Sequence, residues 1–434
     1  MANKFHTCSL ISIFAQVHAP VENGFDFIRR YGGELCEALF CAFWLVLLHF
    51  WLFPAGIHIF PGTGNTTLRK GGGRMETFFC PTKLYCGSGA MSALGRLECQ
   101  RLFLVTEPLL AENGMAQRVV QAAKCSAVEV FDQVGTVPAV EVAAQGAARL
   151  RAYRPDLVAV LGRGSTLDCG KAMSYFARGS HTLAALPTTS GSGGEVMDFV
   201  WLTHGHQWQW LSDPRLRPDV AILDSDLLEQ MPKQVIAEAG FEVLAHAVEG
   251  YVARRGGAMT ALLAREAFGS AYAALPASYA GNTGVRLKIH LAASLAGMAA
   301  AQAGMGLGHA MAQSLGRMFH VPHGQLHAIL LPAVVGCNAH VAGRNYGELA
   351  RAAGLGGSTD AMALGNLKNG LVRLRRELNL PQTLAQAGVD PRRVWRSAGE
   401  LTSQILEDPC CRDNPMPPED FLVRRILEEV TGHL

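Results

Sequence analysis

Short apolar runs alternate with segments of helical spacing between residues 75 and 228. The runs are strand-like because four or five mostly apolar residues stand together in each. Helical spacing covers residues 115–124 and 137–151. Strands separated by helices of this length predict a parallel sheet with helices on both faces. The strand-like runs are 102–106, 127–131, 157–161, 183–186 and 220–223.

The strand-like runs stop after Glu229. From there to Leu434 the chain is rich in Ala and Leu at helical spacing, with few Gly–Pro breaks. This pattern predicts two domains, an α/β domain over residues 75–228 and an all-helical domain over residues 229–434. Ligand sites favour domain interfaces, so we expect the functional site between the two domains.

The first 74 residues differ in pattern from the rest of the chain. Residues 38–53 read ALFCAFWLVLLHFWLF, slightly short of the about 20 apolar residues that span a bilayer. A membrane anchor through residues 38–56 and a signal peptide are two alternatives, and the late start of the run argues against the second. Residues 70–74 (KGGGR) can be encoded by a purine-rich stretch directly before Met75, like that of a bacterial ribosome-binding site. We therefore favour a third interpretation, in which residues 1–74 are a mistranslated upstream region.

Composition narrows the classes of function. At about 150 residues per domain, 434 residues suit two to three domains. The 49% of hydrophobic and 17% of charged residues exclude a disordered chain. The net charge of +2 gives no sign of a nucleic-acid partner. The eleven cysteines contain no C-x-x-C pair, which argues against a disulfide framework and predicts free thiols in a reducing cytoplasm.

Two glycine-rich turns follow neighbouring strand-like runs. The first covers residues 162–165 (GRGS) and leads into a helix that contains Asp168, and the second covers residues 187–195 (PTTSGSGGE). Bare backbone N–H groups at a helix N-terminus bind anions well. Two such turns at the carboxyl ends of adjacent strands suit a nucleotide phosphate. Two ordinary tight turns are the alternative, and the first turn lacks the G-x-G-x-x-G fingerprint.

Four side chains have the chemistry and spacing of divalent-metal ligands. Glu242 and His246 are four residues apart in a helical segment, so they share one face. His309 stands near the start of a second helical segment, and His323 follows that segment in a Pro-His-Gly turn. One carboxylate and three imidazoles suit Fe²⁺ or Zn²⁺, which would polarise an alcohol or carbonyl oxygen.

A hydrogen-bonded histidine inside a helical bundle is the alternative for each of these imidazoles. We assign that structural role to His320 and His327, and a loop position to His204 and His206. Glu249 stands three residues after His246 in the same helical segment, and we interpret it as structural rather than as a metal ligand.

Taken in order, the motifs resemble those of the iron-containing (group III) alcohol dehydrogenases, most closely the propanol and ethanol dehydrogenases of propanediol and ethanolamine utilisation. The resemblance covers about residues 75–434. It implies a dehydroquinate synthase-like fold, in which a nucleotide-binding α/β domain precedes a helical metal-binding domain. The matching segments are 162–168 (GRGSTLD), 187–195 (PTTSGSGGE), 218–224 (PDVAILD), 240–249 (GFEVLAHAVE), 309–313 (HAMAQ), 322–324 (PHG) and 413–415 (DNP).

Several positions depart from the pattern of that family. Glu242 stands where the family has an aspartate ligand, and Gln313 stands where it has a histidine of the active site. An imidazole can relay a proton near neutral pH, whereas an amide cannot, so Gln313 is the position that we expect to limit catalysis. The other differences are Arg163 for Gly, Ser192 for Thr, Gly194 for Ser and Ala245 for Thr.

The resemblance also implies a function, which is NAD(H)-dependent interconversion of a short-chain primary alcohol and its aldehyde. Glu107, after the first strand-like run, would accept a hydrogen bond from the ribose 2′-hydroxyl, and this favours NAD over NADP. The implied catalytic residues are His309 and Gln313. The implied ligands of Fe²⁺, or of Zn²⁺ in its place, are Glu242, His246, His309 and His323. The implied cofactor-binding residues are Glu107, Gly162, Arg163, Gly164, Ser165, Asp168, Thr188, Thr189 and Ser192.

The implied partner is a small alcohol or aldehyde rather than a nucleic acid. The same resemblance implies a homo-oligomer, expected to be a dimer. It also implies a cytoplasmic location, in association with a bacterial microcompartment. The altered site residues leave an alternative, a catalytically weakened member that acts as a binding or scaffold component of an enzyme assembly. A third interpretation is a metal-dependent polyol dehydrogenase or a lyase of the dehydroquinate synthase-like fold. The segments at 240–249 and 322–324 argue against it and favour an alcohol dehydrogenase.

Overall fold

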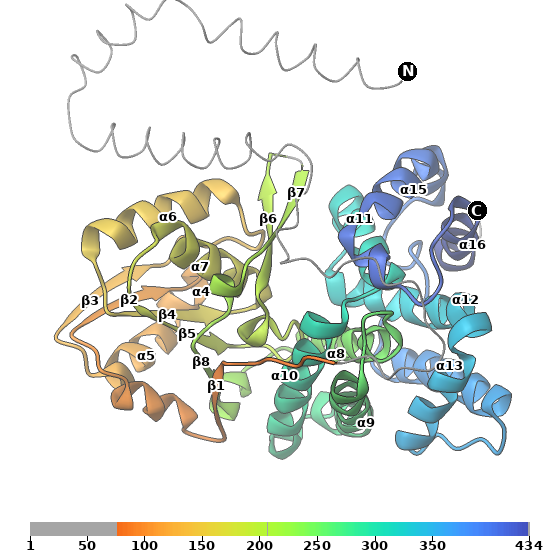
Figure 1. Cartoon of the computed structure of the whole chain (residues 1–434), viewed down its shortest axis with the longest axis horizontal. Coiled ribbons are helices and arrows are strands. Elements are labelled where there is room, and N and C mark those ends of the chain that lie inside the picture. Colours follow the sequence, from red (N-terminus) through yellow and green to blue (C-terminus); the bar gives the residue numbers. More distant parts are fainter. Residues whose placement is uncertain (1–75, 206, 433–434) are drawn as a thin grey trace, which may run out of the picture. The chain divides into compact units, whose positions relative to one another are not determined.

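The computed structural model describes residues 76–205 and 207–432 (Figure 1). These residues belong to one compact unit, which begins at Gly72. The predictions for residues 1–74, including the apolar run at 38–56, lie outside the described residues, and so does His206.

A six-stranded sheet forms the core of the amino-terminal half, in the order β1-β8-β5-β4-β2-β3. Every pair of neighbours in it is parallel, which confirms the predicted sheet. Strand β1 was not predicted: it is only four residues long, and all of them are half-buried or exposed. The strands are β1 (Lys83–Cys86), β2 (Arg101–Val105), β3 (Ala127–Phe131), β4 (Leu157–Gly162), β5 (Thr182–Pro187) and β8 (Val220–Leu223).

Helices cover both faces of the sheet, with α5 and α6 on opposite sides of it (Figure 1). On one face Val119 of α5 packs with Leu102 and Leu104 of β2. On the other face Gly170 of α7 lies so close to Val160 of β4 that a Cβ atom would come within 2.5 Å of the valine methyl group. Burial on both faces explains the continuous apolar strands. The helices are α4 (Pro108–Glu112), α5 (Met115–Ala123), α6 (Val140–Tyr153) and α7 (Gly164–Ala177).

An antiparallel hairpin of β6 (Phe199–His204) and β7 (Gln207–Ser212) stands apart from the main sheet. His204, predicted to lie in a loop, is instead the last residue of β6, where its Nδ1 lies 2.7 Å from a carboxylate oxygen of Glu141. Trp201 and Trp210 stack across the hairpin. In β6, buried Val200 and Leu202 alternate with half-buried residues, whereas no residue of β7 is buried.

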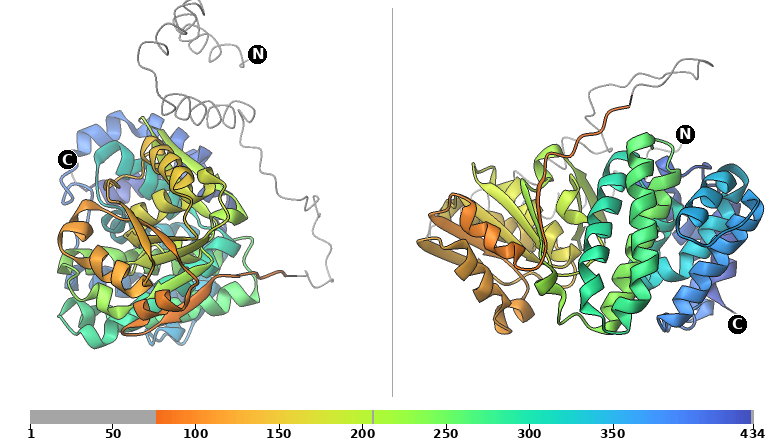
Figure 2. Two further views of the ribbon diagram at one scale, coloured as in Figure 1. Left: turned by 90° about the vertical axis from the view of Figure 1, so that its left-hand side faces the viewer. Right: turned by 90° about the horizontal axis from the view of Figure 1, so that it is seen from below.

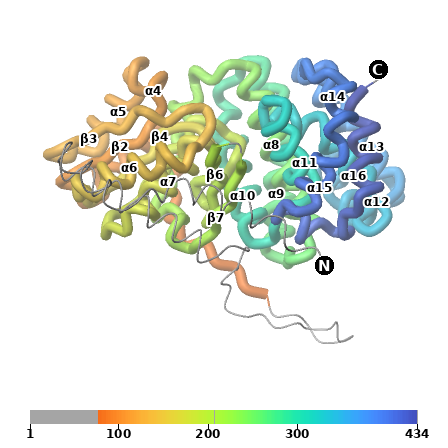
Figure 3. The backbone as a smooth tube through the Cα atoms, turned by 90° about the horizontal axis from the view of Figure 1, so that it is seen from above, coloured from red at the N-terminus to blue at the C-terminus, as the bar shows by residue number. Residues whose placement is uncertain are grey.

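From Lys233 to Thr431, every regular element that the structure describes is a helix, as predicted. Helices α9 and α10 form a pair of neighbours beside the α/β half (Figure 2). Helix α12 contacts α8, α9, α11, α13 and α16. Figure 3 shows α11 to α16 together at one end of the protein. The helices are α8 (Lys233–Val252), α9 (Ala258–Tyr279), α10 (Arg286–Ala303), α11 (Leu307–Phe319), α12 (His323–Ala352), α13 (Asp360–Glu377), α14 (Pro391–Arg396), α15 (Ala398–Glu407) and α16 (Asp420–Thr431).

Helix α12 is long and apolar enough to cross a membrane by length and composition alone. Its most apolar window is 67% buried inside the protein, however. Its side chains pack in both hydrophobic clusters of the helical half, with Val335 in one and Val334 in the other. The apolar character of α12 therefore reflects its place in the core.

One pair of cysteines corrects the prediction of free thiols. Cys99 and Cys125 form a disulfide, with their Cα atoms 5.3 Å apart. Each stands two residues before a strand, and the register pairs Arg101 of β2 with Ala127 of β3. Sequence spacing could not reveal this pair, because only the register of the two parallel strands brings the cysteines together. The other described cysteines are free thiols.

Candidate functional site

The two glycine-rich turns meet at the carboxyl edge of the sheet, as predicted. The Thr188 N–H after β5 donates to the Gly162 carbonyl at the end of β4, at 3.0 Å. A Cβ atom on Gly164 would lie 3.0 Å from that of Ser192, so the two turns approach closely. Parallel α/β sheets bind their ligands at this edge.

The first turn leads directly into α7. Gly162 has no room for a side chain, because a Cβ atom there would lie 2.6 Å from that of Thr166. Arg163, which caps α7, has an ordinary extended backbone (φ −79°, ψ 179°), so the departure from glycine costs no backbone strain. Half-buried Ser165 lies in the first turn of this 14-residue helix. The helix N-terminus therefore offers N–H groups and positive potential to an anion.

Glu107 and Arg163 form an ion pair, with Arg163 Nη2 2.8 Å from Glu107 Oε2. Glu107 follows β2 and Arg163 follows β4, and these neighbouring strands mark the point where the chain crosses from one side of the sheet to the other. Dinucleotides bind at such a switch point. The Glu107 side chain is 9% exposed and that of Arg163 is 42% exposed, so the guanidinium stays accessible to a ligand.

The second turn is braced by the helical half. The Ser190 hydroxyl lies 3.0 Å from Nδ1 of His290 on α10, and the Ser294 hydroxyl on the same helix donates to the Glu195 carboxylate. Half-buried Thr189 lies beside Ser190 in this turn. These two partners on α10 were not predicted, since they lie about 100 residues after Ser190 and Glu195 in the sequence.

Asp168 faces the hairpin. Its carboxylate accepts a hydrogen bond from the Trp201 N–H at 3.1 Å and lies 4.0 Å from Lys171 Nζ. Burial raises the pKa of Asp168 to about 6. These contacts support β6 beside the first turn, and the contact of Asp168 with a cofactor stays a prediction.

A cluster of imidazoles lies at the amino-terminal ends of α11 and α12. The ligand-capable nitrogens of His309, His323 and His327 all lie within 4.8 Å of one another. Nε2 of His323 lies 2.9 Å from Nε2 of His327. We interpreted His327 as a structural histidine of the helical bundle. The structure places it in this cluster, at hydrogen-bond distance from His323. The spacing of four residues after His323 places both rings on one face of α12, which is the rule that paired Glu242 with His246.

Glu249 orients His309. Its carboxylate accepts from Nδ1 of His309 and from the backbone N–H groups of Gly306 and Gly308, at 3.1 and 2.6 Å for the last two. A carboxylate on one ring nitrogen fixes the tautomer and leaves the other nitrogen free for a metal. Nε2 of His309 is buried and has no hydrogen-bond partner among the described residues. The structural role predicted for Glu249 is therefore support of one imidazole in the cluster.

As predicted, Glu242 and His246 lie on one face of a helix, which is α8. Nδ1 of His246 donates to the Glu242 carbonyl at 3.0 Å, and its ring centroid lies 4.3 Å from that of His309. The Glu242 carboxylate instead fills the space beside Gly191, in the second glycine turn. Burial and the negative charge of Asp168 raise the pKa of Glu242 to about 8.

The donor set of the cluster fits a divalent ion. Burial lowers the pKa of both His309 and His323 to about 3, so both rings are neutral and carry a lone pair for a ligand. An unpartnered buried nitrogen costs about 1–3 kcal/mol, and binding of an ion to Nε2 of His309 would remove that cost. Imidazole nitrogens suit Zn²⁺ and Fe²⁺.

Gln313 links the two halves of the protein. In the orientation that satisfies both of its polar groups, its amide donates to Asp408 at 2.8 Å and accepts from the Trp201 indole N–H at 3.2 Å. Helical spacing places it one turn after His309, but its amide is held by a hairpin side chain and a carboxylate. Its catalytic role stays a prediction.

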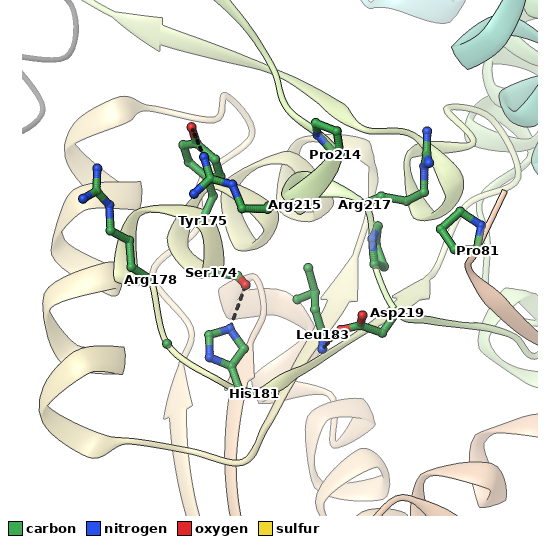
Figure 4. Close-up of a pocket in the computed structure, with 12 residues that line it drawn as sticks. Pro81, Ser174, Tyr175, Arg178, His181, Leu183, Pro214, Arg215, Arg217 and Asp219 are labelled. Carbon is green, nitrogen blue, oxygen red and sulfur yellow. Dashed lines mark hydrogen bonds between the residues drawn. The ribbon is translucent and has the colours of Figure 1, made fainter. Parts of the chain in front are cut away.

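A surface pocket of about 340 Å³ lies elsewhere on the α/β half (Figure 4). Its lining includes His181 and Asp219, which precede β5 and β8, so the pocket is at the amino ends of these strands. The glycine turns are at the carboxyl ends. Two of its arginines are already paired, Arg215 with Asp213 and Arg217 with Asp198. This pocket is therefore separate from the candidate site.

Comparison with known proteins assigns the family. The profile of iron-containing alcohol dehydrogenase matches residues 81–225, and that of the C-terminal part of the Fe-containing alcohol dehydrogenase family matches residues 236–431. The chain is 34% identical over 371 residues to the 1-propanol dehydrogenase PduQ of Salmonella typhimurium, covering 82% of this chain and 100% of that protein. It is 30% identical over 378 residues to an NADPH-dependent butanol dehydrogenase of Clostridium saccharobutylicum, covering 82% and 97%.

A solved structure agrees with these relatives. The iron-containing alcohol dehydrogenase of Thermococcus thioreducens superposes with a TM-score of 0.76 at 28% identity, covering 82% of this chain and 99% of that one. The chain therefore belongs to the iron-containing alcohol dehydrogenase family, whose members are oxidoreductases acting on alcohols. This confirms the resemblance inferred from the sequence motifs.

Proposed function

We propose that the protein interconverts short-chain primary alcohols and aldehydes with NAD(H) and a bound divalent ion, Fe²⁺ or Zn²⁺. The observation that carries the proposal is the buried, unpartnered Nε2 of His309 amid neutral imidazoles. The closely packed glycine turns that suit a dinucleotide support it from the α/β half. The names of the two relatives, which specify propanol and butanol, support a short-chain substrate.

Each part of the site has a task in this proposal. When bound, the ion would polarise the substrate oxygen and the nicotinamide would exchange hydride with the adjacent carbon. His246, His309 and His323 would hold the ion, and Glu249 keeps the His309 ring in its ligating orientation. The N–H groups of the two turns, with Ser192 and Thr188 between them, would bind the dinucleotide phosphates.

A direct test combines metal analysis of the purified protein with aldehyde-dependent NADH oxidation. We expect about one ion per chain, since one cluster is described, and turnover with acetaldehyde, propanal or butanal. Absence of both bound metal and turnover would contradict the proposal and favour the scaffold alternative. The dimer, the cytoplasmic location and the association with a microcompartment stay predictions from the family resemblance.

Removal of the Arg163 side chain is expected to weaken NADH binding. Replacement by alanine deletes a charge-assisted contact to the cofactor phosphates, so we expect Kd for NADH to rise about tenfold. It also leaves the Glu107 carboxylate without its cation. That charge repels a 2′-phosphate, so affinity for NADPH should fall further than affinity for NADH. Fluorescence titration of both cofactors measures these changes.

Arg163→Lys is the matched control, because it keeps the charge but loses the planar fork, and it should retain part of the affinity. Tighter NADH binding by Arg163→Gly would show that the arginine side chain obstructs the turn, which would contradict the proposed contact.

Replacement of Gln313 by histidine is expected to raise kcat. An imidazole at this position can accept and release the substrate proton near neutral pH, and such groups contribute about 10²–10⁴-fold. We therefore expect a gain approaching about 10²-fold, with metal content unchanged. The measurement is the kcat–pH profile of both proteins between pH 6 and about 9, across the range where imidazole titrates. Equal or lower kcat throughout would remove residue 313 from the proton path.

A further inference from the structure

His327 lies deep inside the imidazole cluster. It is 1% exposed, and its ring centroid is 4.3 Å from that of His309 and 4.4 Å from that of His323. His323 and His327 stand on the first two turns of α12, so the helix itself fixes their spacing. Two ligand-capable nitrogens from α12 thus converge with one from α11.

The spacing of these nitrogens suits coordination. Ligands about 2.0–2.1 Å from a tetrahedral ion stand about 3.3 Å from one another. The Nε2 atoms of His323 and His327 lie 2.9 Å apart. All three ligand nitrogens lie within 4.8 Å of one another. Imidazole nitrogens are common ligands of zinc. With His246, whose ring centroid lies 4.3 Å from that of His309, the set has four imidazoles.

Neither Glu242 nor His246 belongs to this group of three ligand atoms. Oε2 of Glu242 occupies the place that a side chain on Gly191 would need, since a Cβ atom there would lie 2.4 Å from this oxygen. Asp168, Glu195 and Glu238 are the charged groups that act on Glu242. Glutamate is one methylene longer than aspartate, and in this structure its carboxylate lies beside Gly191 of the second glycine turn.

We propose that His327 is a metal ligand of this protein in place of Glu242, so that the ion is held by imidazoles alone. The inference rests on the proposed function for the presence of an ion. Neutral ligands leave the full charge of +2 on the ion, whereas a carboxylate would lower it to +1. An all-imidazole set suits Zn²⁺, Co²⁺ and Fe²⁺, and it disfavours Mn²⁺ and Mg²⁺, which prefer oxygen ligands.

The test is titration of metal-free protein with Co²⁺, followed by its visible absorption and by competition with a chelator. His327→Gln keeps a polar side chain of similar reach but removes the imidazole. We expect it to weaken Co²⁺ binding by about 100-fold or more and to change the absorption bands. Glu242→Gln should weaken binding less than about tenfold and leave the bands unchanged. His340→Ala, an exposed histidine on the same helix, is the matched control and should bind as the wild type does.

Several outcomes would overturn the inference. Wild-type affinity in both His327→Gln and His327→Ala would exclude His327 as a ligand. A loss in Glu242→Gln equal to or larger than that in His327→Gln would show that the carboxylate keeps its place. Absence of tight Co²⁺ and Zn²⁺ binding by the wild type would overturn the proposed function and this inference together. Circular dichroism of each variant separates loss of a ligand from loss of the fold.

Discussion

Replacement of His309 by alanine is expected to abolish metal binding and to lower kcat/KM by about 10³-fold or more. An ion that stabilises charge on the substrate oxygen contributes several kcal/mol, and about 1.4 kcal/mol corresponds to each factor of ten. His309 is central because its ring contacts those of His246 and His327 and because its Nε2 has no other partner among the described residues. Metal content and steady-state kinetics of the variant measure both effects.

His340→Ala serves again as the control, since His340 is exposed and distant in sequence from the cluster. Unchanged metal content in His309→Ala, with the fold intact, would mean that the ion binds elsewhere. If activity is lost while metal content is unchanged, His309 would act on the substrate even though it does not hold the ion.

The second large effect is expected from Glu249→Ala, which should lower both the stability and the metal affinity of the protein. Its buried carboxylate accepts from the N–H groups at the start of α11 and from the His309 ring. Each hydrogen bond to a charged group is worth about 1.5–3 kcal/mol, so we expect the free energy of unfolding to fall by about 3 kcal/mol or more. Loss of such an outer support typically costs about 10–100-fold in metal affinity.

Urea unfolding and chelator competition measure the two effects separately. Glu249→Gln keeps one acceptor oxygen, so it should lie between the wild type and Glu249→Ala in both. Glu112→Ala removes an exposed carboxylate on α4 and should change neither. Wild-type metal affinity in Glu249→Ala would contradict the role given to this carboxylate.

Much of the fold could be predicted from the sequence because its strands are buried on both faces. The runs at β3 and β8 match the structure at both ends. Strand β1 and the hairpin of β6 and β7 were not predicted. No residue of β1 or β7 is buried, and only Val200 and Leu202 of β6 are, so these strands lack the two-sided burial of the main sheet. The disulfide of Cys99 and Cys125 depends on the register of two strands, which sequence spacing does not encode.

The candidate site shows a similar limit. The two glycine turns were predictable because residues after adjacent parallel strands share one edge of a sheet. His327 was interpreted as structural, although its spacing from His323 is the same as that from Glu242 to His246. The direction of the Glu242 carboxylate depends on Gly191, which comes from the other half of the protein, and so lies beyond any local pattern.

The most direct measurement of the proposed function is chelation and reconstitution of a single purified sample. Propanal-dependent NADH oxidation would be followed before treatment with a strong chelator, after removal of the metal, and after addition of Fe²⁺ under anaerobic conditions or of Zn²⁺. A metal-dependent dehydrogenase predicts that activity disappears with the ion and returns when about one equivalent per chain is restored. Activity that persists in metal-free protein, or that never appears with either ion bound, would contradict the proposed function.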